Sequence, residues 1–117
     1  MLVVANFLVV LVAVLHIGFL VLEMFYWDRP IGRKIFRTTP EFSKASAVLA
    51  SNQGLYNGFL AAGLIWGLVT GQVNVIVFFL LCVLIAGIYG GLTAGRTILL
   101  VQALPAVLAL FALYLSS

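Results

Sequence analysis

Two ionisable residues lie in the first long apolar segment, where ionisable residues are rare and mark candidate sites. His16 and Glu23 are seven residues apart, so on a helix they project from nearly the same face, about 10 Å apart along the axis. As a pair they could serve as a catalytic acid and base, and His16 could also relay a proton. The structural alternatives are a neutral His16 bonded to a facing polar group, and a Glu23 that reaches headgroup water or pairs with Arg29.

A second polar group lies in the next apolar segment and would occupy an arc of about 140° on a helix. Its members fall within six residues: Asn52, Gln53, Tyr56 and Asn57. They could bind a polar headgroup, or they could serve only as interhelical hydrogen bonds worth about 1 kcal/mol each. We expect Tyr89 and Gln102, from later segments, to contribute to the same ligand-binding site.

The composition indicates that membrane helices position these residues. Of 117 residues, 65% are hydrophobic and 8% charged, whereas a soluble domain has about 25% charged residues. This excludes soluble enzymes, nucleic-acid binders and disordered tails. With one cysteine and one histidine, the chain lacks the ligand set of a zinc site, and we expect neither metal nor cofactor.

Continuous apolar runs predict an all-α fold, an antiparallel bundle of four transmembrane helices in a single domain, residues 1–117. A bilayer core requires about 20 helical residues. The segments that meet this length are 2–27, 45–69, 75–94 and 97–115. A basic loop, residues 28–44, separates the first two, and we expect Pro30 to Gly32 and Thr39-Pro40 to interrupt helix there.

The distribution of basic residues predicts the orientation. With four spans, all six Lys and Arg residues fall on one side of the membrane, so the positive-inside rule places the loop 28–44 in the cytoplasm and both termini outside. Counted from Trp27 at the interface, Glu23 would lie about 6 Å deep and His16 about 16 Å. The polar residues then share the cytoplasmic half of the bilayer, and the outer half is apolar apart from Asn6. This arrangement predicts a pocket open to the cytoplasm and sealed outside.

Small residues recur at helical spacing and predict close helix approach. They are Gly54 and Gly58, Gly63 and Gly67, and Gly87, Gly91 and Gly95. Besides packing within the chain, such ridges could support a homo-oligomer. Pro105 leaves the carbonyl of Val101 without its helical partner and predicts a kink near Gln102.

Several motifs together resemble a known family. They are His16, Glu23-Met24 and Trp27, then the stretches 52–61 (NQGLYNGFLA), 86–90 (AGIYG) and 102–106 (QALPA). The chain is similar over nearly its whole length to small four-helix bacterial membrane proteins of unknown function, sometimes labelled "predicted membrane protein" or "epimerase". The resemblance implies four spans in a bacterial cytoplasmic membrane and no particular activity. The chain has no nucleotide-binding fingerprint that would support the epimerase label.

Three functions fit these patterns. In the first, the pocket binds a small amphipathic or lipidic ligand from the cytoplasmic leaflet, with or without catalysis by His16 and Glu23. In the second, the chain is a non-catalytic helix-packing subunit or assembly factor. The third is a small proton-coupled transporter. The expected partners are membrane lipids, with no nucleic acid.

Overall fold

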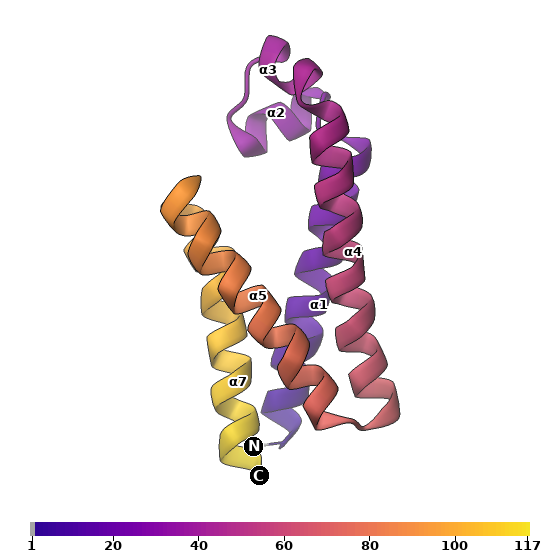
Figure 1. Ribbon diagram of the computed structural model, residues 1–117, viewed down its shortest axis with the longest axis vertical. Helices are drawn as coiled ribbons and strands as arrows, with labels where there is room; N and C mark the ends of the chain where they lie inside the picture. The colour runs from indigo at the N-terminus through magenta and orange to yellow at the C-terminus, as the bar shows by residue number, and fades with distance from the viewer. Residues whose placement is uncertain (1) are drawn as a thin grey trace. The chain divides into compact units, whose positions relative to one another are not determined.

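The computed structural model describes residues 2–117, and every element in that range is helical (Figure 1). The long helices are α1 (Leu2–Phe25), α4 (Ala47–Thr70) and α5 (Val73–Thr93). The last stretch consists of α6 (Arg96–Ile98), a π-helical turn η1 (Leu99–Ala103) and α7 (Leu104–Ser116). Two short helices, α2 (Pro30–Phe36) and α3 (Pro40–Ala45), connect α1 to α4. The all-helical prediction is confirmed for the described residues.

Among residues 2–117, three helical stretches are long and apolar enough to cross a membrane: Leu2–Phe25, Val73–Thr93 and Arg96–Ser116. These candidate spans indicate a membrane protein. Helix α4 is not among them, although its 24 residues correspond to about 36 Å. Its polar run around Asn52 and Asn57 lowers its hydropathy.

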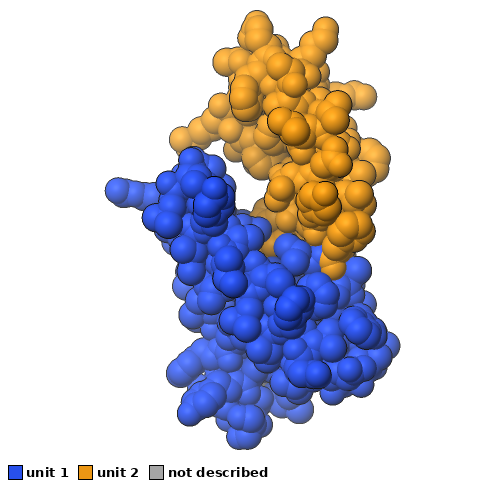
Figure 2. Space-filling view, in the orientation of Figure 1, with its two compact units in different colours: residues 1–14, 60–117 blue, residues 15–59 orange. Residues whose placement is uncertain are grey.

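The chain divides into two compact units (Figure 2). Unit 2 comprises residues 15–59, which are the second part of α1, the helices α2 and α3, and the first part of α4. Unit 1 comprises the beginning of α1, up to Val14, and residues 60–117.

Unit 1 has the apolar core, built from small and branched side chains. Its buried members are Ala5, Val9, Val12, Ala13, Ala61, Leu64, Ile76, Leu80, Val83, Ala106, Ala109, Ala112 and Leu113. Helices α4 and α5 pack as an antiparallel hairpin in which Gly67 meets Ile76 and Gly63 meets the ring of Phe79. The beginning of α1 and the end of α7 lie at the same end of this unit (Figure 1).

The turn between α4 and α5 is closed by a glycine in the left-handed region. Gly71 has a φ of 67°, which residues with a Cβ rarely adopt. The amide of Gln72 donates to the carbonyl of Gly67 at 3.0 Å, and that of Gly71 to Leu68 at 3.4 Å. This pattern of a Schellman motif satisfies the last carbonyls of α4 and starts α5 two residues later.

The helix irregularity predicted near Pro105 is present as the π-helical turn Leu99–Ala103. Proline has no amide hydrogen and its ring crowds the carbonyl four residues earlier, so the wider turn lies immediately before it. The turn packs closely on α5: a Cβ on Gly87 would lie 2.7 Å from the backbone nitrogen of Ala103.

In unit 2, α1 and α4 run antiparallel with two glycines at their contact. A Cβ on Gly54 would lie 2.7 Å from Met24 Cγ, and one on Gly58 would lie 2.5 Å from Leu20 Cδ1. The absence of these carbons lets the two backbones approach closely.

The segment between α1 and α4 is more helical than the sequence indicated. Pro30 and Pro40 were expected to interrupt helix, but each stands at the beginning of one. The prediction was wrong for Pro30 to Gly32, which lie in α2, because the first helical position needs no amide donor and suits the fixed φ of proline. It is confirmed for Thr39-Pro40, because helix is interrupted between Phe36 and Pro40. At the start of α3, Thr39 accepts a hydrogen bond from the amide of Phe42 at 3.2 Å, which caps the helix.

Candidate functional site

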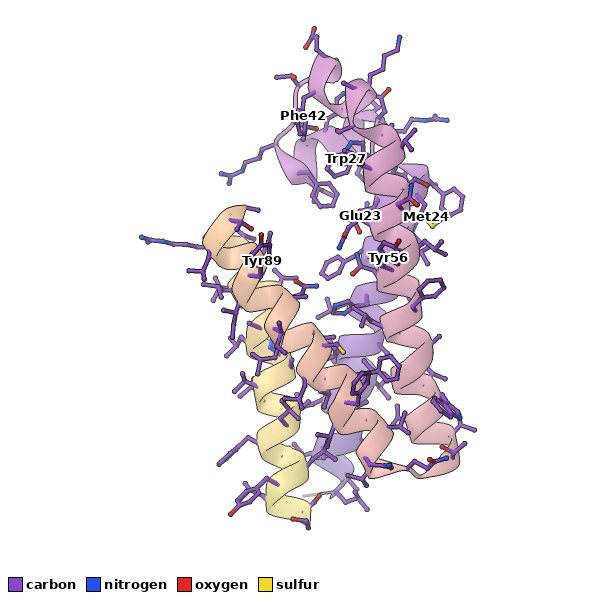
Figure 3. The ribbon with its side chains drawn as sticks, in the orientation of Figure 1. Glu23, Met24, Trp27, Phe42, Tyr56 and Tyr89 are labelled. Carbon is purple, nitrogen blue, oxygen red and sulfur yellow. The ribbon has the colours of Figure 1, made fainter. Side chains whose placement is uncertain are left out.

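A carboxylate and an amide meet between α1 and α4 in unit 2. Asn57 Nδ2 donates to Glu23 Oε1 at 2.5 Å. Asn57 is 4% exposed, and Glu23, which is labelled in Figure 3, is half-buried. This bond connects side chains of two different helices, α1 and α4.

Glycine packing explains why Asn57 meets Glu23. Gly54 lies one turn before Asn57, and a Cβ there would lie 3.1 Å from Glu23 Cβ. Residues three apart share a helix face, so the glycine that allows close approach also turns Asn57 toward α1. The short Asn side chain then spans the remaining distance to the carboxylate.

His16 lies two helical turns before Glu23 on α1 and is fully buried. Its ring meets Phe19 edge to face, with centroids 5.1 Å apart and planes at 71°. This buried aromatic packing restrains the imidazole orientation.

The other polar residues of α4 have different surroundings. Asn52 is exposed, and its Nδ2 donates to the carbonyl of Val48, in its own helix, at 2.9 Å. Gln53 is exposed. Tyr56 is 56% exposed, with its ring 6.0 Å from that of Phe59. Of the predicted arc, Asn57 therefore contacts Glu23, whereas Asn52 is bonded within α4.

Tyr89 and Gln102 belong to unit 1, while His16, Glu23 and the polar residues of α4 belong to unit 2. Tyr89 is exposed on α5, and Gln102 is half-buried in the π-helical turn.

A second polar network joins the segment that follows α1 to α2, to α3 and to the residue that caps α3. Trp27 Nε1 donates to Ser46 Oγ at 3.0 Å, and its ring lies 4.9 Å from that of Phe36. Asp28 Oδ1 accepts from the fully buried Ser43 Oγ at 2.7 Å and from Arg33 Nη1 at 3.0 Å. Ser43 and Ser46 were not predicted from the sequence. Hydroxyls in a loop carry no periodic signal, and their partners depend on how the short helices fold back.

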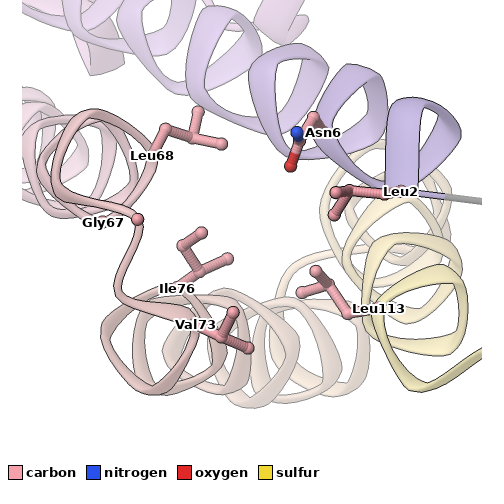
Figure 4. A pocket seen from close by; sticks show the side chains of 8 residues that line it. Leu2, Asn6, Gly67, Leu68, Val73, Ile76 and Leu113 are labelled. Atoms are coloured by element: carbon pink, nitrogen blue, oxygen red, sulfur yellow. The ribbon is translucent and has the colours of Figure 1, made fainter. Parts of the chain in front are cut away.

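A cavity of about 250 Å³ lies in unit 1, beside the α4–α5 turn (Figure 4). Its lining residues are Leu2, Asn6, Gly67, Leu68, Gly71, Val73, Ile76 and Leu113. Asn6, the polar exception in the predicted outer half, contributes the side-chain amide of this wall. None of the residues predicted for the ligand site lines this cavity.

Comparison with known proteins places the chain in a family. The uncharacterized protein YpaA of Lactococcus lactis subsp. lactis (strain IL1403) is 32% identical over 104 residues, which cover 86% of this chain and 87% of that protein. No solved structure matches the chain. Residues 10–114 match the family described as a protein of unknown function, DUF1304. The chain therefore belongs to the DUF1304 family of proteins of unknown function, which confirms the resemblance found in its motifs.

Proposed function

We propose that this membrane protein binds the polar end of a small amphipathic or lipidic molecule at Glu23 and Asn57. The observation that carries the proposal is their hydrogen bond between two helices of an apolar chain. An ionised carboxylate has about four lone-pair sites, and the bond to Asn57 uses one. Glu23 therefore keeps the capacity to accept from a hydroxyl or ammonium group of a ligand.

Other residues predicted from the sequence also have roles in the proposed binding. His16 supplies a buried imidazole two turns farther along α1. The exposed side chains of Gln53 and Tyr56 supply polar atoms near the entrance. Catalysis is not needed for this function, and an acid–base role for His16 and Glu23 would be an addition to it.

The proposed topology makes α4 a fourth span. Helix α4 contacts the apolar span α1 at Gly54 and Gly58, and its 24 residues are sufficient to cross a bilayer. The basic segment 28–44 then lies in the cytoplasm of a bacterium, with both termini outside, and the site opens from the cytoplasmic leaflet. The proposal includes a ligand pocket at the membrane depth of Glu23 and Asn57.

The test is native mass spectrometry of the protein released from mild detergent, with co-purified molecules identified by their mass. We compare wild type with Glu23→Gln, which retains an acceptor for Asn57, and with Asn57→Leu. Asn52→Leu is the matched control, because Asn52 has the same side chain on the same helix but is bonded within α4. We expect a bound molecule in wild type and in Asn52→Leu, with occupancy about tenfold lower in Glu23→Gln because a charge-assisted bond becomes neutral. Equal occupancy in all four proteins would refute ligand binding at this site.

A purely structural role is the second candidate, supported by the same bond together with the two glycine contacts. In that case Asn57→Leu lowers the stability of the folded protein, and no molecule bound in wild type is lost from Glu23→Gln. The occupancy of the bound molecule in Glu23→Gln separates the two functions, because Asn57→Leu is expected to lower stability in both.

A further inference from the structure

The segment between α1 and α4 exposes large apolar side chains next to a membrane span. We call residues 26–46 the cap. Ile31 and Ile35, one turn apart on α2, are 53% and 51% exposed. Phe42 on α3, which is labelled in Figure 3, is 57% exposed. The apolar span α1 ends at Phe25, immediately before the cap. Apolar side chains at this position are at the level where a bilayer meets water.

The cap also carries most of the charge of the chain, and one cation is already paired. Residues 28–44 include five basic and two acidic residues. Arg33 is bonded to Asp28, which also accepts from the buried Ser43. Arg33 therefore stabilises the cap itself. The exposed basic residues are Arg29, Lys34, Arg37 and Lys44.

The packing of α2 determines the direction in which each of its side chains points. Gly32 is buried against the carbonyl of Tyr26, and Phe36 packs on Trp27, so this side of α2 is held against the end of α1. At about 100° per residue, Lys34 points away from that side, and Ile31 and Ile35 form one flank. Arg33 lies on the opposite flank. An apolar flank next to an outward cation is the arrangement of a helix that lies in a membrane interface.

We infer that the cap is a docking surface for anionic phospholipids of the membrane that the protein spans. Ile31, Ile35 and Phe42 enter the boundary between headgroups and acyl chains. Lys34 and Arg37, with Arg29 nearby, contact the lipid phosphates. Charge complementarity favours anionic phospholipids as the ligand, because these lipids concentrate at exposed cations next to a membrane span. The surface does not depend on the proposed site at Glu23 and Asn57.

The experiment uses Trp27 as a reporter built into the cap. The chain has two tryptophans, so Trp66→Phe leaves Trp27 alone. The full-length protein is reconstituted into vesicles of phosphatidylcholine and phosphatidylglycerol in which one of the two lipids carries bromine. Quenching of Trp27 by each brominated lipid gives the relative association of the two lipids with the cap. Lys34→Gln/Arg37→Gln tests the cations, Ile31→Ser/Ile35→Ser tests the apolar flank, and Arg96→Gln controls for loss of a basic residue outside the cap.

We expect phosphatidylglycerol to be preferred at Trp27, and high salt to weaken the preference. Lys34→Gln/Arg37→Gln should lower it at least fivefold, since each interfacial cation contributes about fivefold, and Arg96→Gln should leave it unchanged. Ile31→Ser/Ile35→Ser should reduce quenching by both lipids. The inference is overturned if wild type shows no preference or if the Lys34→Gln/Arg37→Gln protein keeps it. It is also overturned if Ile31→Ser/Ile35→Ser leaves quenching unchanged. In that case the cap does not enter the bilayer, and its cations would bind an acidic protein.

Discussion

The bond between Glu23 and Asn57 predicts an unusual order of stabilities in a double-mutant cycle. Replacing Glu23 by Leu leaves the amide of Asn57, which is 4% exposed, without its partner, and an unsatisfied buried polar group costs about 1–3 kcal/mol. Replacing Asn57 by Leu leaves a half-buried carboxylate unpaired, with a cost of similar size. Replacing both residues by Leu removes both polar groups at nearly constant volume, which is close to neutral.

The expected coupling energy follows from the type of bond and from the groups that the single variants leave unpaired. Interhelical hydrogen bonds in membranes average about 0.6 kcal/mol, and an ionised partner roughly doubles this. The bond by itself therefore contributes about 1 kcal/mol. Because each single variant also leaves an unpaired group that costs about 1–3 kcal/mol while the double variant is close to neutral, we expect a coupling free energy of about 2–6 kcal/mol, with the double variant more stable than either single variant.

The measurement is reversible unfolding in mixed micelles, followed by far-ultraviolet circular dichroism during titration with a denaturing detergent. Asn52→Leu serves as the control and should leave the unfolding midpoint unchanged, because Asn52 bonds within α4. Additive effects of the two substitutions, with the double variant the least stable, would refute the reasoning. That result would mean that the two side chains do not share a bond.

Close backbone contacts lead to two more predictions. Gly87→Ala should destabilise the protein by about 1–3 kcal/mol, because the new carbon would lie 2.7 Å from the Ala103 backbone. Gly18→Ala, where nothing lies within 4 Å, should add about 0.5–1 kcal/mol through helix propensity. Thermal unfolding of the two alanine variants checks this contrast, and equal shifts would contradict it. Gly32→Ala should displace α2 from Tyr26, whose carbonyl occupies the space. Faster cleavage of the cap by trypsin with an unchanged global midpoint is expected, whereas wild-type cleavage would show that the contact does not hold α2.

Most residues of the candidate site could be found in the sequence, but which polar residue of α4 contacts Glu23 could not. Glu23 and Asn57 were both predicted, because polar residues in apolar segments are few and conspicuous. Asn52, Gln53, Tyr56 and Asn57 are equivalent by type and spacing, however. Their arc fixes only their relative directions, and the rotation of α4 against α1 depends on how Gly54 and Gly58 pack.

The sequence by itself determined that the chain is a helical membrane protein, because the free energy of transfer from water to lipid depends on composition and length. The local chemistry of Pro105 likewise determined that its helix would be irregular. Only the tertiary structure decided that Asn57 faces the carboxylate while Asn52 bonds within α4. It also decided that Arg33 is paired inside the cap while Lys34 is exposed. Both outcomes depend on the rotation of a helix in its packing contact, which is set by backbone approach at Gly54 and Gly58 for α4 and at Gly32 for α2 and not by the polar residues themselves.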